Sequence, residues 1–348
     1  MKILNIMSSK ILGGVEQAFL NYNKLLSLIG FEVFAIYNKN GKIKQKLEKI
    51  DNINYLPSIF FKPYFLLFPY YYFKIKKIKP DFILVQTKKI LPLFAKIGKM
   101  LNIPVILVAH NDKIKLIDKA DYIFSITQYQ KDIFVKNGFN ENKIFVIPNV
   151  VDKIIDFQEF KDFSNPPVFG TMCRFDPMKG LTILIEACRI LKEKNINFKL
   201  KIGGSPQKQY LNEYNKILNL IEKYNLKNNI ELVGWIDNTE IFYKNIDTFI
   251  LPSVYEPFGI VLLEAMIHSK PIISSLAEGP SEIFKNTKND FVFSVGDYQK
   301  LAELMIKMIN NKELAKKIVE DNYKMVNEKY SLIAISRSLK EVFNKINN

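Results

Sequence analysis

The sequence predicts an α/β fold made of two doubly wound domains in tandem. Short β-rich runs alternate with helical patterns, which is typical of parallel sheets. The alternation breaks once, at residues 148–152, and a polar and aromatic stretch ending at Pro167 follows. The chain of 348 residues also exceeds the usual size of one compact domain. We therefore expect a first domain over residues 1–150, a linker over 151–166 and a second domain over 167–330.

The first domain is predicted from runs rich in apolar and β-branched residues, separated by helical apolar spacing. The expected strands are 2–7, 32–37, 54–56, 82–86, 105–109, 122–126 and 144–147. Helical patterns lie between most of them, for example 15–28 and 91–101. The alternation of strand and helix predicts a parallel sheet.

The same alternation starts again after the linker. The expected strands are 168–172, 199–202, 231–233, 248–251, 271–274 and 291–293, and the expected helices are 181–194, 210–224, 260–268 and 298–309. Two further helical patterns, 312–327 and 332–346, close the chain, and we expect the last to pack near the first domain. Ligands of doubly wound sheets bind beyond the carboxyl ends of the strands, so a cleft between two facing domains is the expected site.

The composition is that of a globular protein, with 48% hydrophobic and 24% charged residues. Cys173 and Cys188 lie in periodic apolar segments and form neither a disulfide framework nor a metal-ligand spacing, which favours a cytoplasmic location. The start of the chain resembles a first strand rather than a signal peptide. The densest apolar segment, 59–73, is interrupted by Pro63, Pro69 and Lys62, so we expect no transmembrane helix.

The net charge of +15 suggests a polyanionic partner, such as nucleic acid, an anionic membrane surface or a phosphorylated substrate. The alternative is compositional drift, because the lysines are spread along the whole chain. Only three of the fifty basic residues are arginines: Arg174, Arg189 and Arg337. Arg174 is distinctive because it follows a strand and enters a loop, where its planar fork can bind a phosphate.

Two loops carry candidate phosphate-binding groups. Gly13 and Gly14 follow the first strand, where glycines let the backbone approach a ligand next to a helix N-terminus. The alternative is a tight strand-to-helix turn. Arg174 and Lys179 flank the turn at Asp176-Pro177, and both can converge on a diphosphate. The alternative for this pair is two solvated loop cations.

The segment from Glu256 to Glu264 is the most informative in the chain. It follows the strand 248–251 and reads Glu-Pro-Phe-Gly-Ile-Val-Leu-Leu-Glu, so Gly259 stands at the N-terminus of a predicted helix. Such a position offers backbone N–H groups to a phosphate or a sugar oxygen. Glu264 lies among apolar residues, where an ionised group needs a partner. The alternatives are a helix-dipole Glu and a surface Glu.

These motifs together resemble the retaining glycosyltransferases of the GT-B fold, specifically glycosyltransferase family 4. The family's Glu-x7-Glu signature matches Glu256 and Glu264 within Pro-Ser-x-x-Glu-Pro-Phe-Gly-Ile-x-x-Leu-Glu-Ala-Met. The resemblance also covers Gly13-Gly14, Arg174 with Lys179, Val233-Gly234 and the 279–282 segment, which we expect to be a loop. It therefore extends over essentially the whole chain.

The resemblance implies roles for individual residues. Glu264 binds the ribose hydroxyls of a nucleoside-diphosphate sugar, and Glu256 holds the donor sugar. The backbone N–H groups of Phe258, Gly259 and Ile260 hold the diphosphate. The remaining implied site residues are Arg174 and Lys179 at the leaving diphosphate, Gly14 with Gly13 in a closing loop, Gly234 in the donor site, and His110 facing the donor sugar. His268 is expected to be structural.

The implied reaction transfers a sugar from the nucleotide sugar to a glycan or lipid-linked acceptor, with retention of configuration. Cations and helix N–H groups stabilise the charge that develops on the leaving diphosphate. The chain has no Asp-x-Asp motif, and the family is metal-independent, so we expect neither a metal nor another cofactor. Cell-envelope polysaccharide or lipopolysaccharide synthesis is the expected pathway.

Residues 60–79 interleave aromatic side chains with a lysine cluster. This pattern suits the interface of an anionic membrane, which predicts peripheral attachment to the inner face of the cytoplasmic membrane. The alternative is an amphipathic helix that packs on the sheet and leaves its lysine end solvated.

Three other functions remain open from the sequence. A dehydrogenase shares the doubly wound sheet, but the dinucleotide fingerprint is missing. A sugar-nucleotide epimerase with the GT-B fold differs in needing no acceptor. A nucleic-acid-binding protein would exploit the positive charge and bind with steep salt dependence, but the site motifs lead us to expect no nucleic acid partner.

Overall fold

The computed structural model describes residues 1–11, 13–47, 50–160, 162–285, 287 and 290–347. The chain forms two compact units. The first comprises Met1–Lys153 with Lys329–Asn348, and the second comprises Ile154–Glu328. Each unit is built on a parallel sheet, as the sequence predicts.

The first unit contains a seven-stranded parallel sheet with the order β3-β2-β1-β4-β5-β6-β7. Its strands are β1 (Lys2–Met7), β2 (Glu32–Asn38), β3 (Ile53–Ser58), β4 (Phe82–Val85), β5 (Val105–Ala109), β6 (Tyr122–Ser125) and β7 (Ile144–Val146). The strand order reverses between β1 and β4, because the chain moves outward on one side through β2 and β3 and returns to the other side at β4. In doubly wound sheets, ligands bind at such a switch point.

Alternating side chains of the strands feed two cores, one on each face of the sheet. Ile3 and Val33 pack toward α1 (Gly14–Leu28) and α12 (Leu332–Asn347), whereas Leu4 and Ile83 pack toward the opposite face. That second face carries α2 (Phe68–Ile78), α3 (Leu91–Leu101) and α4 (Gln128–Lys136). Such side-to-side alternation follows from the two-residue period of a strand.

The C-terminal helix α12 belongs to the first unit. Phe343 makes edge-to-face contacts with Phe31, Phe82 and Phe124, at ring-centroid distances of 5.4, 5.3 and 5.8 Å. These rings are buried, so the helix completes the core on the α1 face.

The second unit contains a six-stranded parallel sheet with the order β10-β9-β8-β11-β12-β13. Its strands are β8 (Val168–Met172), β9 (Lys199–Gly203), β10 (Ile230–Gly234), β11 (Thr248–Leu251), β12 (Ile272–Ser275) and β13 (Val292–Phe293). Here the order reverses between β8 and β11.

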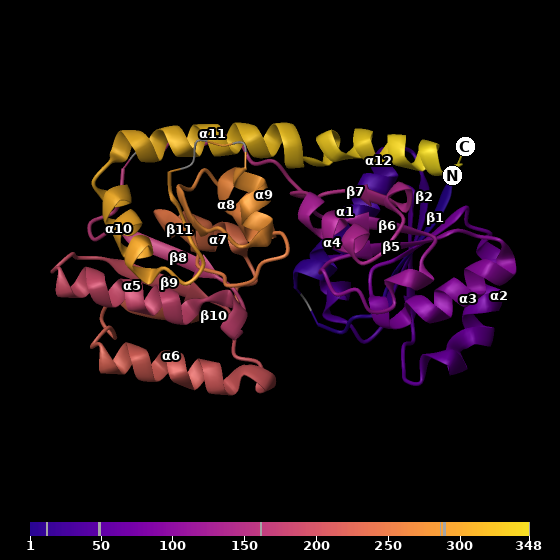
Figure 1. Ribbon diagram of the computed structural model, residues 1–348, viewed down its shortest axis with the longest axis horizontal. Coiled ribbons are helices and arrows are strands. Elements are labelled where there is room, and N and C mark those ends of the chain that lie inside the picture. The colour runs from indigo at the N-terminus through magenta and orange to yellow at the C-terminus, as the bar shows by residue number, and fades with distance from the viewer. Residues whose placement is uncertain (12, 48–49, 161, 286, 288–289, 348) are drawn as a thin grey trace. The chain divides into compact units, whose positions relative to one another are not determined.

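Helices cover both faces of the second sheet (Figure 1). One core unites the sheet with α5 (Leu181–Glu193), α6 (Leu211–Lys223), α10 (Tyr298–Ile309) and the start of α11 (Lys312–Tyr330). The other face carries α7 (Thr239–Lys244), α8 (Ile260–Ile267) and α9 (Glu278–Phe284). Side-chain caps mark several helix starts: Asn238 accepts a hydrogen bond from Ile241 N and Asp297 from Lys300 N.

The segment predicted as a linker is held along α11 rather than extending freely. Tyr323 donates a hydrogen bond to the Ile155 carbonyl at 2.7 Å, and its ring contacts Phe157. Lys316 pairs with Glu159 at 2.5 Å. Earlier, Val151 bridges to Ser331 within the first unit.

The structure corrects one local expectation. Residues 279–282, expected as a loop, form most of the first turns of α9. Pro280 does not prevent this, because the first-turn N–H groups of a helix have no intrahelical partner to lose. Among the described residues, no helix has the length and apolar content needed to cross a bilayer.

Candidate functional site

The loops after β8 and β11 meet at the switch point of the second sheet. Val254 N–H and Tyr255 N–H both donate to the Met178 carbonyl, at 2.9 and 3.1 Å. Gly180 makes this approach possible. It has φ +67°, and a Cβ atom placed there would lie 1.9 Å from the Pro252 carbonyl oxygen. A larger residue would force the two loops apart.

An ion pair joins the same two loops. Lys179 Nζ donates to Glu256 Oε2 at 2.7 Å, and the two side chains are only 16% and 13% exposed. Because the pair is largely shielded from water, its attraction is stronger than that of a surface pair. The sequence-predicted residues Lys179 and Glu256 are thus brought into direct contact across 77 residues of chain.

Arg174 lies in the same β8 loop. Its Nη2 donates to Asp176 Oδ2 at 3.2 Å, while the arginine side chain remains 47% exposed. Asp176 is buried and also accepts from Met178 N–H at 3.1 Å, which fixes the turn before Lys179. Asp176 was not singled out from the sequence, although an Asp before a Pro is a common turn-initiating signal.

The β11 loop is supported by the start of α9. Gly279 N–H donates to the Glu256 carbonyl at 2.8 Å, and a Cβ at Gly279 would lie 2.3 Å from Phe258 Cα. Glu278 accepts from Glu256 N–H at 3.4 Å. The Phe258 side chain is buried, so the loop leading to α8 is held from below and behind by packing and hydrogen bonds.

The N-terminus of α8 is a potential anion site. Gly259 caps the helix with φ +98°, a left-handed conformation that favours glycine. Gly259 and Ile260 follow directly after the Lys179–Glu256 pair in the structure of the loop. The first N–H groups of a helix have no intrahelical partner and point toward the positive end of its dipole, where a phosphate binds well.

Glu264 has the partner that its apolar neighbourhood requires. Tyr243 on α7 donates a hydrogen bond to Glu264 Oε2 at 3.4 Å and to the Val261 carbonyl at 3.2 Å. Burial, and then the Glu264 charge, raise the pKa of the Tyr243 hydroxyl well above its ordinary value, so it stays a donor. The ring of Tyr243 stacks on His268 at 4.6 Å, and burial lowers the pKa of His268 to about 4. His268 therefore has the structural role expected for it.

Gly234 ends β10 at the same edge of the sheet. It has φ +79°, and its carbonyl accepts a hydrogen bond from Gly204 N–H at 2.7 Å. The second unit thus gathers Arg174, Lys179, Gly234 and the Glu256–Ile260 loop at the carboxyl edge of its sheet, where ligands of this fold bind.

In the first unit, His110 follows β5 and is tied to a chain of buried amides. Its Nε2 lies 2.8 Å from Gln86 Oε1, an acceptor, so Nε2 carries the ring proton. Gln86 donates to Asn5 Oδ1 at 2.9 Å, and Asn5 donates to Asn23 Oδ1 at 2.7 Å. Gln86 comes directly after β4, and a polar residue at the end of a buried strand is the sequence signal that could have identified it.

The imidazole of His110 stays neutral over the physiological range. Burial, and then the nearby Lys88 charge, lower its pKa to about 4. Burial also lowers the pKa of Lys88 to about 8. Lys88 Nζ donates to the carbonyl and side-chain oxygens of Asn111, both at 3.1 Å, and to the Lys113 carbonyl, so it braces the loop that follows His110.

Gly13 and Gly14 lie at the switch point of the first sheet. Gly13 caps α1 in an extended conformation, and both glycines are exposed. Leu12, which precedes them, lies outside the described residues. The placement after β1 agrees with the sequence expectation, but their contact with a ligand stays a prediction.

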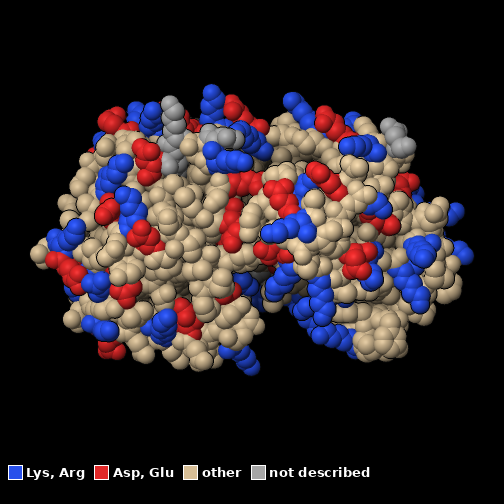
Figure 2. All heavy atoms as spheres, viewed as in Figure 1, with Lys and Arg blue, Asp and Glu red and all other residues tan. Residues whose placement is uncertain are grey.

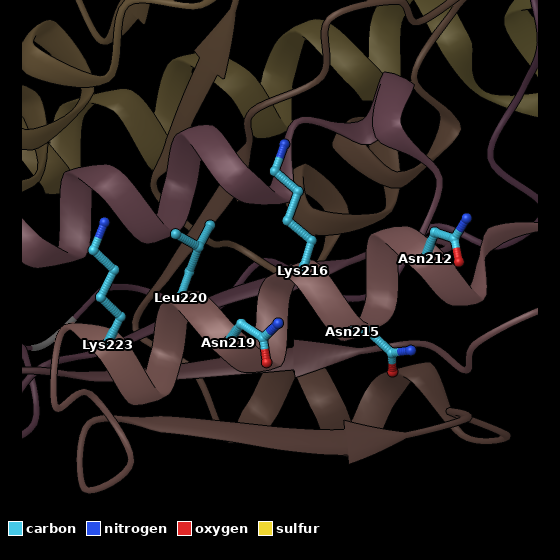
Figure 3. Close-up of a pocket in the computed structure, with 6 residues that line it drawn as sticks. All are labelled: Asn212, Asn215, Lys216, Asn219, Leu220 and Lys223. Carbon is cyan, nitrogen blue, oxygen red and sulfur yellow. The ribbon is translucent and has the colours of Figure 1, made fainter.

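A depression on α6 is separate from this arrangement (Figure 3). Its lining residues all come from that helix: Asn212, Asn215, Lys216, Asn219, Leu220 and Lys223. Because one helix alone forms it, it lacks the converging walls that enclose a small ligand. The carboxyl edges of the two sheets remain the candidate site regions.

The chain matches two family models. Residues 152–325 match the model described as Glycosyl transferases group 1, and residues 12–153 match Glycosyltransferase Family 4. The chain belongs to the glycosyl transferases group 1 family. It is therefore a glycosyltransferase with the α/β GT-B fold.

Relatives of this glycosyltransferase occur in archaea and bacteria. It is 31% identical to an uncharacterized glycosyltransferase of Methanocaldococcus jannaschii over 73% of this chain and 72% of that protein. Two Staphylococcus aureus proteins are each 26% identical: poly(ribitol-phosphate) alpha-N-acetylglucosaminyltransferase, over 65% of this chain, and the capsular polysaccharide biosynthesis glycosyltransferase CapM, over 67%. The matches span only 44% and 63% of those two proteins' own lengths.

The solved structure of Anabaena HepE in complex with UDP-glucose has the same fold. The TM-score is 0.85 at 20% sequence identity, covering 99% of this chain and all of that one. The comparisons do not favour an epimerase or a nucleic-acid-binding protein.

Proposed function

We propose that this glycosyltransferase moves a sugar from a nucleoside-diphosphate sugar to a glycan or lipid-linked acceptor of the cell envelope, with retention of configuration and without a metal. The observation that carries the proposal is the shielded Lys179–Glu256 pair, placed beside the α8 N-terminus at the switch point of the second sheet. A cation and helix N–H groups at one place match the charge of a diphosphate.

The ion pair prepares Lys179 for an incoming anion. In the free enzyme, Glu256 neutralises the lysine and holds it in position across the two loops. When the donor binds, the diphosphate takes over part of this contact and Glu256 becomes available to sugar hydroxyls. Arg174, half-exposed and anchored by Asp176, adds a second cation for the leaving diphosphate. Preorganised charges of this kind stabilise a transition state without a cost of reorganisation.

The remaining residues complete the proposed donor site. Glu264, held by Tyr243, accepts hydrogen bonds from the ribose hydroxyls. The backbone at Phe258, Gly259 and Ile260 binds the phosphates, and Gly234 leaves room beside the nucleotide. Gly13, Gly14 and His110 keep the roles that the family resemblance gives them. Neutral His110 suits a hydrogen bond to a sugar hydroxyl rather than proton transfer.

The names of relatives suggest the acceptor and the first donors to test. One relative acts on poly(ribitol-phosphate) and another takes part in capsular polysaccharide synthesis. HepE was solved with UDP-glucose and TarM with UDP. We therefore propose an envelope polysaccharide pathway at the inner face of the cytoplasmic membrane, with a UDP-sugar as donor.

A thermal-shift screen of UDP-, GDP- and ADP-sugars tests this proposal, because a ligand that binds only the folded state raises the melting temperature. We expect one base to stabilise the wild-type enzyme, and the stabilisation to be lost in Lys179→Ala. The matched control is Lys24→Ala, since Lys24 pairs with Asp152 at 2.6 Å, is also 16% exposed, and lies in α1. A nucleotide that stabilises Lys179→Ala as much as the wild type would contradict the site.

A further inference from the structure

The segment from Ile59 to Lys79 presents an unusual outer surface on the first unit. It contains five lysines, and the chain carries no Asp or Glu between Asp51 and Asp81. It folds as a short 3₁₀ helix, η2 (Tyr64–Leu67), followed by α2. We call the exposed side chains of residues 59–79 the aromatic–basic face.

One side of this segment is firmly anchored in the core. Tyr71 donates to the Ile59 carbonyl at 2.9 Å and to Ser58 Oγ at 3.0 Å, and its ring packs against Phe60 and Phe94 at 5.5 and 5.0 Å. Tyr71 and Ile75 are fully buried. The apolar residues needed to hold the helix are therefore already satisfied.

A second set of large apolar side chains points outward. Phe65 and Phe73 are 70% and 67% exposed, and Ile59, Phe61, Leu66 and Tyr70 are 47–56% exposed. Tyr70, Phe73 and Lys77 follow a spacing of three and four residues, so they share the outer face of α2. Exposed apolar clusters of this kind mark interaction surfaces in soluble domains.

Basic side chains border the same surface. At the lower right of Figure 2, where Figure 1 places α2 and α3, uncharged atoms form a protrusion with basic side chains beside it. Lys74 lies over the Tyr70 ring at 5.4 Å, and Lys76 lies over the Tyr72 ring at 5.9 Å. The lysine stems thus cover aromatic rings and keep their ammonium groups at the rim.

We propose that the aromatic–basic face docks the enzyme on an anionic lipid surface. Aromatic rings suit the depth of lipid headgroups, and lysines at the rim attract anionic lipids. A second copy of the chain is a poorer occupant, because a symmetric contact places the same patch against itself and would oppose lysine to lysine. Docking rests on the proposed function for its purpose, which is to bring the enzyme to a lipid-linked or envelope acceptor.

The face is ready for docking without further folding. Its helices are formed and anchored through Tyr71, so binding a bilayer does not carry the ordering cost of a disordered segment. The outward residues do not belong to the core clusters of buried residues, so their replacement by Ser leaves the fold intact.

Cosedimentation with vesicles tests the proposal, using phosphatidylglycerol mixed with phosphatidylcholine, and phosphatidylcholine alone, in the absence of nucleotide. We expect the wild-type enzyme to bind the anionic vesicles, with weaker binding at high salt. Phe65→Ser/Phe73→Ser should lower the partition coefficient at least about tenfold. Gln at Lys74, Lys76 and Lys77 should lower it about fivefold per lysine.

The matched control is Ile241→Ser/Ile333→Ser, because these side chains are 58% and 63% exposed and lie on α7 and α12. The control should bind like the wild type. The proposal is overturned if the wild-type enzyme ignores anionic vesicles, if the control loses as much as the Phe variant, or if binding depends on the lysines alone. It is also overturned if the Phe variant instead dissolves a dimer or abolishes RNA binding without a change in vesicle binding.

The result is separable from the proposed function. Vesicle binding is measured without catalysis, so it stands even if no nucleotide sugar binds. Conversely, donor binding by the Phe65→Ser/Phe73→Ser variant should equal that of the wild type. Loss of donor binding there would show a folding defect and would contradict an outward-facing role for these rings.

Discussion

The carboxyl edges of the two sheets carry contrasting chemistry. In the second unit, cations and carboxylates are paired across loops: Lys179 with Glu256, and Arg174 with Asp176. In the first unit, His110 is neutral and ends a chain of uncharged amides through Gln86. One edge is therefore built for a charged ligand group, and the other for a neutral one.

The difference extends to how each unit uses a buried lysine. Lys179 is held by a carboxylate that a diphosphate can replace. Lys88, by contrast, donates to the Asn111 and Lys113 carbonyls and serves as a brace for the loop after His110. A lysine at the end of a strand is thus not by itself a phosphate-binding signal; its partner decides.

The largest expected effect follows from removing the charge of the second unit. Lys179→Ala should lower kcat/KM about 100- to 1000-fold, the range found when a group that stabilises a transition-state anion is removed. Steady-state transfer assays with the identified donor measure this, and circular dichroism confirms the fold. Activity within about threefold of the wild type would show that Lys179 does not act at the diphosphate.

The close approach of the two charged loops can be broken without touching a charge. Gly180→Ala places a Cβ 1.9 Å from the Pro252 carbonyl oxygen at φ +67°, so we expect the free energy of unfolding to fall by about 3 kcal/mol or more. The control Gly138→Ala has a similar φ, +86°, but open space around it, and should cost only about 1 kcal/mol. Equal losses in urea denaturation would mean that the loop approach contributes nothing.

The neutral edge of the first unit can be altered at Gln86. Gln86→Leu removes the acceptor of the His110 ring proton and should lower kcat/KM about three- to tenfold, the net value of one hydrogen bond. Gln86→Glu should instead raise the pKa of His110, because a carboxylate favours the imidazolium. NMR titration of the ring measures this shift. An unchanged pKa in Gln86→Glu would show that the two side chains are not in contact.

A smaller effect concerns stability against acid. The pKa of His110 is about 4 in the folded state and about 6.5 when unfolded, so folding favours the neutral ring. This contribution is present above pH 6.5 and is lost as the pH falls from 6.5 toward 4. Between pH 7 and pH 5 the wild type should lose about 1–2 kcal/mol more than His110→Asn, measured by urea denaturation. Parallel pH profiles would refute a buried neutral histidine.

Most of the fold follows from local sequence patterns. The strands 2–7, 105–109, 168–172 and 248–251 and the helices 91–101 and 298–309 are predicted with the bounds that the structure shows. These segments are long apolar runs or strongly amphipathic stretches, for which periodicity is decisive. The short helices α7 and α9 were not predicted, because six or seven residues carry too little periodicity and Pro280 suggests a loop.

The candidate site was predictable as a set of residues but not as a set of contacts. Glu256, Lys179 and Gly259 stand in recognisable loop positions after strands. Their partners do not: Asp176, Tyr243 and Gln86 became visible only when tertiary packing brought distant segments together. The requirement that a carboxylate among apolar residues needs a partner predicted that Glu264 would have one, but not that it would be Tyr243.

The most direct test of the account is the affinity for UDP measured by isothermal titration calorimetry. We predict that Lys179→Ala weakens UDP binding at least about tenfold, because it removes a cation and leaves the Glu256 carboxylate unpaired beside the diphosphate. Lys179→Ala/Glu256→Ala should recover part of that loss, and Lys24→Ala should bind like the wild type. If Lys179→Ala binds UDP as tightly as the wild type, the charged edge of the second unit is not the diphosphate site.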